Sequence, residues 1–235
     1  MNWSAPKRPV DHAEHALITA ILAGDFVPGS ALPAERELAG MIGVTRPTLR
    51  EALRRLERDG WLVVQQGKAT TVTDFWRDGG LNVLNGIARH SSVLPDDFVP
   101  NLLQVRLDLA PTYTRLAVTR APERVAGLLK SAASIDDTPP AYAAYDWQLQ
   151  RLLTVESGNA VYALIFNSFA GFYEQMAALY FAGDEARQVS RVYYADLQAA
   201  VERGDAAHTE TITRDVMRAS IDLWQRAAGT KGEQA

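Results

Sequence analysis

The sequence of 235 residues contains no cysteine, and this absence excludes several classes of site at once. Without a thiol there is no disulfide bond, no thiolate zinc site, no cysteine-ligated iron–sulfur cluster and no cysteine nucleophile. Histidine is scarce as well, since only 4 are present and none belongs to an HExxH metal-binding motif. We therefore predict neither a bound metal ion nor a cofactor.

Long uninterrupted hydrophobic runs are also absent. The most apolar stretch, residues 160–182, is interrupted by Asn167, Ser168, Glu174 and Gln175, so it lacks the run of about eighteen apolar residues that a membrane helix requires. The start of the chain shows no apolar segment typical of a signal peptide. We predict a cytoplasmic protein without a membrane partner, in which residues 160–181 form one helix buried in the core.

No strong excess of one charge sign is present, because 24 basic residues stand against 28 acidic ones and the net charge is −4. A weakly acidic chain argues at first against a nucleic-acid partner, but electric fields on proteins are local. Up to Asp78, ten basic and ten acidic residues balance, so the rest of the chain carries the whole net charge. This distribution indicates a neutral N-terminal part and an acidic C-terminal part with different functions.

Hydrophobic periodicity and turn residues predict the architecture of the N-terminal part. We expect helices at residues 10–22, 34–40 and 45–59, followed by a β-hairpin with strands at 61–64 and 69–73. Thr45 is a good N-cap for the third helix, and a glycine follows each helix. This order of elements is typical of a winged helix-turn-helix, an α+β fold.

From residue 80 onward the periodicity is helical almost throughout and predicts an all-α bundle. The expected helices are 82–90, 96–120, 122–134, 140–155, 160–181, 185–203 and 206–228. We assign residues 1–73 to the winged helix-turn-helix domain, 74–80 to a linker and 81–235 to a helical regulatory domain.

The third predicted helix carries the strongest chemical signal. Beside its apolar face, arginines follow one another at a spacing of four residues: Arg46, Arg50 and Arg54. The helix has five arginines against two glutamates, a local charge of +3. Arginine offers paired donors to guanine and phosphate, and a helix fits the major groove of DNA. The alternative is a solvent-exposed amphipathic helix whose arginines pair with glutamates.

The surroundings of this helix favour DNA binding. Thr45 and Thr48 place short donors in the first turn, where a recognition helix meets bases or phosphates. Gln66 and Lys68 lie at the predicted hairpin tip, from which they would reach the DNA backbone or the minor groove. No nucleophile elbow or phosphate loop is present, so we predict a DNA-binding protein and not an enzyme.

The segment LPAERELAGMIGVTRPTLREALRRLERDGWLVVQQGK, residues 32–68, resembles the DNA-binding domain of GntR-type bacterial regulators. Residues 75–89, 101–117 and 157–173 resemble the FadR subfamily, and the likeness covers nearly the whole chain. It implies DNA contacts by Arg36, Thr45, Arg46, Thr48, Arg50, Gln66, Gly67 and Lys68. Two residues depart from the subfamily, because Pro47 replaces a hydroxyl residue and Gln66 replaces a histidine of the wing.

The resemblance also implies a ligand. Many GntR-type regulators hold a divalent metal with one aspartate and three histidines, but here only Asp146 matches, and the other positions are Gln150, Tyr194 and Val216. The FadR subfamily instead binds long-chain fatty acyl-CoA inside the helical bundle. The implied ligand-binding residues are Arg106, Tyr180, Arg214, Ser220 and Trp224. The alternative is a plain core position for Trp224 and surface ion pairs for the arginines.

These predictions describe a homodimeric transcription regulator of fatty acid metabolism. Two winged helices related by a two-fold axis would bind a palindromic operator of double-stranded DNA, with the recognition helices in the major groove. Long-chain acyl-CoA would release the protein from the operator by favouring a second dimer geometry. A different effector, such as a small carboxylate, is the alternative.

Overall fold

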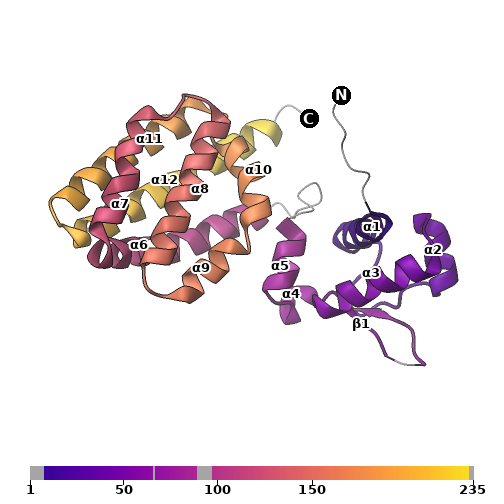
Figure 1. Ribbon diagram of the computed structural model, residues 1–235. Helices are drawn as coiled ribbons and strands as arrows, with labels where there is room; N and C mark the ends of the chain where they lie inside the picture. Colours follow the sequence, from indigo (N-terminus) through magenta and orange to yellow (C-terminus); the bar gives the residue numbers. More distant parts are fainter. Residues whose placement is uncertain (1–7, 66, 89–96, 233–235) are drawn as a thin grey trace, which may run out of the picture. The chain divides into compact units, whose positions relative to one another are not determined.

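The computed structural model describes residues 8–65, 67–88 and 97–232, and its contacts divide the chain into two compact units, Met1–Leu94 and Pro95–Ala235 (Figure 1). This division lies beyond the predicted linker, residues 74–80, because the segment that follows the hairpin packs on the first unit. Phe75 contacts Trp61 with ring centroids 5.1 Å apart, and Val83 is buried next to Gly60. By its contacts, this segment belongs with the winged helix.

The first unit consists of helices and one short hairpin, which extends from one side of them (Figure 1). Its described elements are α1 (Pro9–Ala23), α2 (Glu35–Ile42), α3 (Arg46–Arg58), β1 (Leu62–Val63), β2 (Thr71–Val72), α4 (Phe75–Asp78) and α5 (Leu81–Ala88). Their order confirms the predicted winged helix-turn-helix. The strands are shorter than predicted, and they pair antiparallel with Leu62 opposite Val72.

Local sequence explains how the central helices are joined. Gly43 adopts φ = +78°, a left-handed conformation that glycine tolerates, and this turns the chain between α2 and α3. Thr45 caps α3 as predicted, because its hydroxyl accepts a hydrogen bond from the Thr48 amide at 3.3 Å. The apolar residues of α3 are buried, which turns the arginine-rich face of the helix toward solvent.

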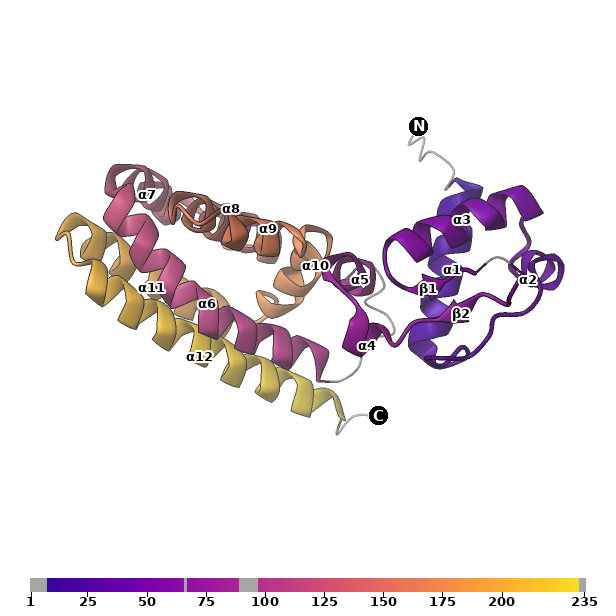
Figure 2. The same ribbon diagram turned by 90° about the horizontal axis from the view of Figure 1, so that it is seen from below.

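The second unit is an all-α bundle, as predicted (Figure 2). Its described elements are α6 (Phe98–Arg120), α7 (Pro122–Leu129), the 3-10 helix η2 (Lys130–Ser134), α8 (Pro139–Glu156), α9 (Ala160–Asn167), α10 (Ala170–Tyr180), α11 (Asp184–Glu202) and α12 (Ala206–Gly232). The long helices α6 and α12 run side by side, α11 packs against α12, and α8 lies against both α6 and α10. One apolar core joins these helices.

The predicted single helix over residues 160–181 is wrong, because the chain turns at Ser168 and Phe169 and forms α9 and α10. The Ser168 hydroxyl donates to the Leu164 carbonyl at 2.9 Å, and the Phe169 amide donates to the Phe166 carbonyl at 3.0 Å. Such side-chain and three-residue hydrogen bonds replace the regular α-helical pattern. Within the part of the chain that the structure describes, no helix is both long enough and apolar enough to span a bilayer.

Candidate functional site

Most of the predicted DNA-binding residues are exposed to solvent, at α3, on α2 and in the hairpin loop. Exposed residues of this set are Thr45, Arg46 and Arg50 at α3, Arg36 on α2, and Gly67 and Lys68 in the hairpin loop. Thr48 is half-buried, and its hydroxyl lies 2.8 Å from that of Thr45. Gln66 lies outside the described residues. The surface therefore combines a helix face and a hairpin loop, as a winged helix-turn-helix requires.

A carboxylate from α2 contacts two of the arginines predicted to bind DNA. Arg50 Nε donates to Glu35 Oε2 at 2.8 Å, and Arg46 Nη2 lies 3.7 Å from the same oxygen. All three side chains remain partly exposed. The sequence reasoning missed Glu35, because it is 15 positions from Arg50 and reaches it only through the turn between α2 and α3.

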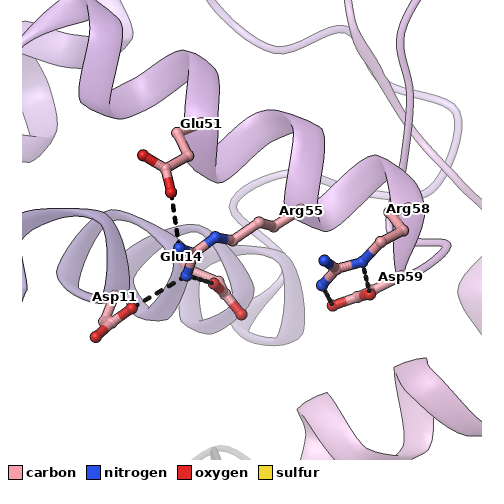
Figure 3. Close-up of polar contacts among 6 residues, drawn as sticks. All are labelled: Asp11, Glu14, Glu51, Arg55, Arg58 and Asp59. Atoms are coloured by element: carbon pink, nitrogen blue, oxygen red, sulfur yellow. Dashed lines mark hydrogen bonds and ion pairs between the residues drawn. The ribbon is translucent and has the colours of Figure 1, made fainter.

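Two arginines in the C-terminal half of α3, Arg55 and Arg58, have different partners (Figure 3). The carboxylates around Arg55 belong to Glu51 at 2.7 Å, Asp11 at 3.2 Å and Glu14 at 3.6 Å. Arg55 thus ties α3 to α1, and its hydrogen bond with Glu51 raises the pKa of Arg55 above its usual value. Arg58 forms an ion pair with the neighbouring Asp59 at 2.9 Å.

Carboxylates outside the helix partly offset its predicted charge of +3. Carboxylates offset Arg55 and Arg58, whereas Arg54 is exposed and forms no ion pair with another described residue. The cationic surface that remains for a nucleic acid consists of Arg54 and of Arg46 and Arg50, whose charge Glu35 partly offsets. The alternative to DNA binding was that the arginines of this helix pair with glutamates. Such pairs do form, between Arg50 and Glu35 and between Arg55 and Glu51.

A cavity of about 90 Å³ lies inside the helical bundle of the second unit, and its walls are mostly apolar. Four of the predicted ligand-binding residues line it: Arg106, Tyr180, Ser220 and Trp224. Arg214 does not line this cavity, because its guanidinium donates to Glu210 on the same helix at 2.9 Å. For Arg214 the structure therefore shows the ion pair that was considered as the alternative.

One wall of the cavity carries a buried ion pair. Arg106 Nη2 on α6 lies 3.4 Å from Asp146 Oδ2 on α8, and Asp146 is only 7% exposed. Tyr173 and Tyr194 both donate their hydroxyls to this carboxylate, Tyr194 at a distance of 3.2 Å. The guanidinium of Arg106 also lies 5.5 Å from the centroid of the Tyr173 ring. Donors from three helices therefore surround Asp146.

Burial sets the protonation of the groups around this carboxylate. It raises the pKa of Tyr173 and that of Tyr194 well above the usual value, so both phenols stay protonated and donate. Burial also opposes the positive charge of Arg106, but the neighbouring carboxylate of Asp146 favours it, and the pKa of Arg106 is raised. Arg106 is therefore a permanent cation inside the bundle.

Two buried N–H groups near the ion pair have no hydrogen-bond partner within the described residues, namely Arg106 Nε and Gln150 Nε2. The other end of the Gln150 amide is occupied, since its oxygen accepts a hydrogen bond from Tyr113 at 2.6 Å. Buried donors without a partner are costly, and an oxygen atom of a ligand would satisfy them. Of these two residues, Arg106 lines the apolar cavity and Gln150 does not.

A second polar contact joins α10 and α12 at the cavity. The Tyr180 hydroxyl donates to Ser220 Oγ at 3.1 Å, and Ser220 Oγ donates to the carbonyl of Val216 at 2.8 Å. Two predicted ligand-binding residues thus contact each other directly. A ligand that enters between α10 and α12 would have to separate them or pass beside them.

The residues weighed for a metal site serve a different purpose. Asp146 is engaged by Arg106 and two tyrosines, and divalent metals favour histidine or several carboxylates, which these neighbours do not supply. In the ranges 8–65, 67–88 and 97–232, no group of three or more histidine, aspartate and glutamate side chains is placed to hold a metal ion. The sequence indicated Asp146 because it matches the aspartate of the metal-binding relatives, but its actual partners become visible only in the fold.

Comparison with known proteins covers both units. The family described as "Bacterial regulatory proteins, gntR family" matches residues 9–72, and the family described as "FadR C-terminal domain" matches residues 73–232. A "Fatty acid metabolism regulator protein" of Serratia proteamaculans is 39% identical over 94% of this chain and 93% of its own length. One of the same name from Yersinia pestis is 40% identical, with the same coverage.

A solved structure shares the fold. Its title reads "Lar controls the expression of the Listeria monocytogenes agr system and mediates virulence", and it aligns with a TM-score of 0.62. The alignment covers 95% of this chain and 99% of the other, at 15% sequence identity. At this identity the likeness concerns the fold alone.

Proposed function

Because the chain belongs to the gntR family of bacterial regulatory proteins and carries a FadR C-terminal domain, we propose that it is a transcription regulator of fatty acid metabolism. The family consists of regulators, which agrees with the expectation that the chain is not an enzyme. The proposal places the protein in the cytoplasm, bound to operator DNA as a homodimer. The observation that supports an acyl ligand is the apolar cavity with the buried ion pair in its wall.

In this proposal α3 is the recognition helix. Its apolar face is held in the core, and its N-terminal half exposes Arg46 and Arg50 toward the major groove. Gly67 and Lys68 in the hairpin loop would contact the flanking backbone or minor groove. A homodimer presents two such surfaces related by a two-fold axis, which suits a palindromic operator.

The proposed effector is long-chain fatty acyl-CoA. The cavity has room for only a few water molecules, so a long acyl chain fits only if the surrounding helices move apart. This movement would affect two contacts in the cavity wall, the hydrogen bond between Tyr180 and Ser220 and the ion pair of Arg106 and Asp146. A ligand that binds only the expanded bundle shifts the protein toward that state, and operator binding weakens if the operator favours the other state.

A small carboxylate is the second candidate effector. The observation in its favour is Arg106 Nε, a buried donor of a cavity-lining cation without a partner in the described part of the chain. A carboxylate would satisfy this donor with a charge-assisted hydrogen bond and needs less space than an acyl chain.

Electrophoretic mobility shift tests the proposal. The operator is first recovered by selecting bound sequences from a random pool of duplexes, and long-chain acyl-CoA, coenzyme A, free fatty acid and small carboxylates are then titrated into the complex. Release by long-chain acyl-CoA alone supports the proposal. Release by a small carboxylate alone favours the second candidate, and a complex that no compound releases contradicts both.

Arg46→Ala is expected to weaken operator binding by about 5- to 150-fold and binding to a random duplex much less, because one bidentate arginine–base contact contributes about 1–3 kcal/mol. Fluorescence anisotropy at one fixed salt concentration measures both affinities. Arg58→Ala is the matched control, since Arg58 lies at the other end of the same helix and pairs with Asp59. An equal loss on both duplexes would make Arg46 a phosphate contact.

A further inference from the structure

Glu35 contacts two of the exposed arginines of the recognition helix, Arg46 and Arg50, although it belongs to α2. Its Oε2 atom accepts a hydrogen bond from Arg50 Nε at 2.8 Å and lies 3.7 Å from Arg46 Nη2. One carboxylate oxygen therefore faces two side chains that are one helical turn apart. Neither arginine is buried, so this contact, and not packing in the core, restricts their side chains.

The atoms involved leave the Nη edge of Arg50 free, whereas Arg46 faces Glu35 with its Nη2 atom. Arg50 uses Nε for Glu35, and its two Nη groups remain available as a fork for guanine O6 and N7. Holding one edge of a guanidinium reduces the conformational freedom that the side chain loses when the other edge binds. Glu35 is therefore placed to orient Arg50 without competing for the donors that read a base.

The position of Glu35 is itself well supported. It is the first residue of α2, where a negative side chain interacts favourably with the helix dipole. The left-handed turn at Gly43 then fixes the distance between this end of α2 and the start of α3. The carboxylate is thus held by the fold of the helix-turn-helix and does not depend on DNA.

The charge of Glu35 has a second consequence. A carboxylate beside Arg46 and Arg50 repels DNA phosphates, and this repulsion acts on every sequence alike. A correct base offers directed acceptors that compensate for the repulsion, whereas a random duplex offers only its backbone. The same carboxylate is therefore expected to lower non-specific affinity more than operator affinity.

We propose that Glu35 is a specificity-determining positioning residue, which orients Arg50 and Arg46 for base recognition and disfavours their binding to phosphate alone. The inference rests on the proposed function in DNA binding. Glu35 acts through the two arginines and makes no base contact of its own.

Three variants separate orientation from charge. Glu35→Ala removes the acceptor and the charge, Glu35→Gln keeps an oxygen that Arg50 Nε can bind and removes the charge, and Glu37→Gln is the control. Glu37 lies in the same first turn of α2 and is exposed, and no ion pair forms between it and another described residue. Each full-length protein selects sequences from the same random duplex pool, and its affinities for the wild-type operator and a random duplex are measured at one salt concentration.

We expect Glu35→Ala to reduce the ratio of operator to random affinity about tenfold, within the factor on the order of 5 to 150 that one bidentate arginine contact provides. Its selected sequences should lose base preference at the positions that Arg46 and Arg50 read. Glu35→Gln should bind random DNA more tightly than the wild type and keep most of the base preference. Glu37→Gln should retain both the ratio and the selected sequence.

Two results would overturn the inference. One is a Glu35→Ala protein that selects the wild-type sequence with the wild-type affinity ratio. The other is a Glu37→Gln protein that changes the ratio as much as Glu35→Gln, since the effect would then be one of bulk charge. Failure of the proposed function looks different, because the wild-type protein itself would select no sequence from the pool.

Discussion

Asp146→Asn is expected to destabilise the helical unit by about 3 kcal/mol. The substitution keeps the size of the side chain and removes its charge, so Arg106 becomes a buried cation without a counter-ion. Removing one partner of a buried ion pair costs about 3–5 kcal/mol. The lower end applies because the Arg106 side chain is 22% exposed. Deprotonation cannot relieve the cost, because the guanidinium group of arginine stays protonated in proteins.

Urea unfolding followed by circular dichroism measures this change in free energy. Asp196→Asn is the control, because Asp196 is exposed on α11 and its substitution should change stability by less than about 0.5 kcal/mol. The double variant Arg106→Met, Asp146→Asn removes the cation as well and should recover most of the loss. A double variant as unstable as Asp146→Asn would show that the hydrogen bonds from Tyr173 and Tyr194 matter more than the charge.

Trp61→Ala is expected to destabilise the winged helix by about 3–5 kcal/mol, which is typical when a fully buried aromatic side chain is truncated. Trp61 is 1% exposed, and its ring contacts Phe75 and lies against the backbone of α5 at Gly86. It also stands where α3 leads into the hairpin, since its amide donates to the Leu56 carbonyl at 2.8 Å. The variant should therefore lose the packing of α4 and α5 on this unit.

Hydrogen–deuterium exchange of the full-length protein shows which segments of the chain lose stability in the Trp61→Ala variant. Peptides from the first unit should lose protection, and those from the helical bundle should not. Trp76→Ala is the matched control, because Trp76 lies in the same helix as Phe75 but is 55% exposed, and its truncation should cost less than about 1 kcal/mol. Equal losses for the two tryptophans would contradict the assigned role of Trp61.

Much of the first unit could be predicted because its signals are local. Thr45 caps α3, Gly43 makes the preceding turn, and the apolar spacing of α3 is regular, so each residue acts on its own neighbours. The turn at Ser168 was missed for the opposite reason. The residues on both sides of it are apolar and helical in pattern, and hydrophobicity does not show that a serine hydroxyl will bond the carbonyl four residues earlier.

The site residues also differ in whether a local pattern or the packing of distant elements determines them. Exposure of Arg46 and Arg50 follows from the pattern of one helix, and it was predicted. The contacts of Glu35 with these arginines and of Asp146 with Arg106 join residues of different helices, the latter 40 positions apart, and depend on how the elements pack. Arg214 was predicted from the resemblance alone; its guanidinium donates to Glu210 one turn away, it does not line the cavity, and its contact with a ligand stays a prediction.

The approach of α5 to Trp61 limits which mutations this chain tolerates. A methyl group at position 86 would lie 2.8 Å from the Trp61 ring, so even alanine forces the buried ring or the helix to shift. One turn earlier, Asn82 is exposed and leaves room for other side chains. Substitutions should accumulate on one side of α5 over evolutionary time and be purged at Gly86, although this glycine adopts an ordinary helical backbone that any residue could take.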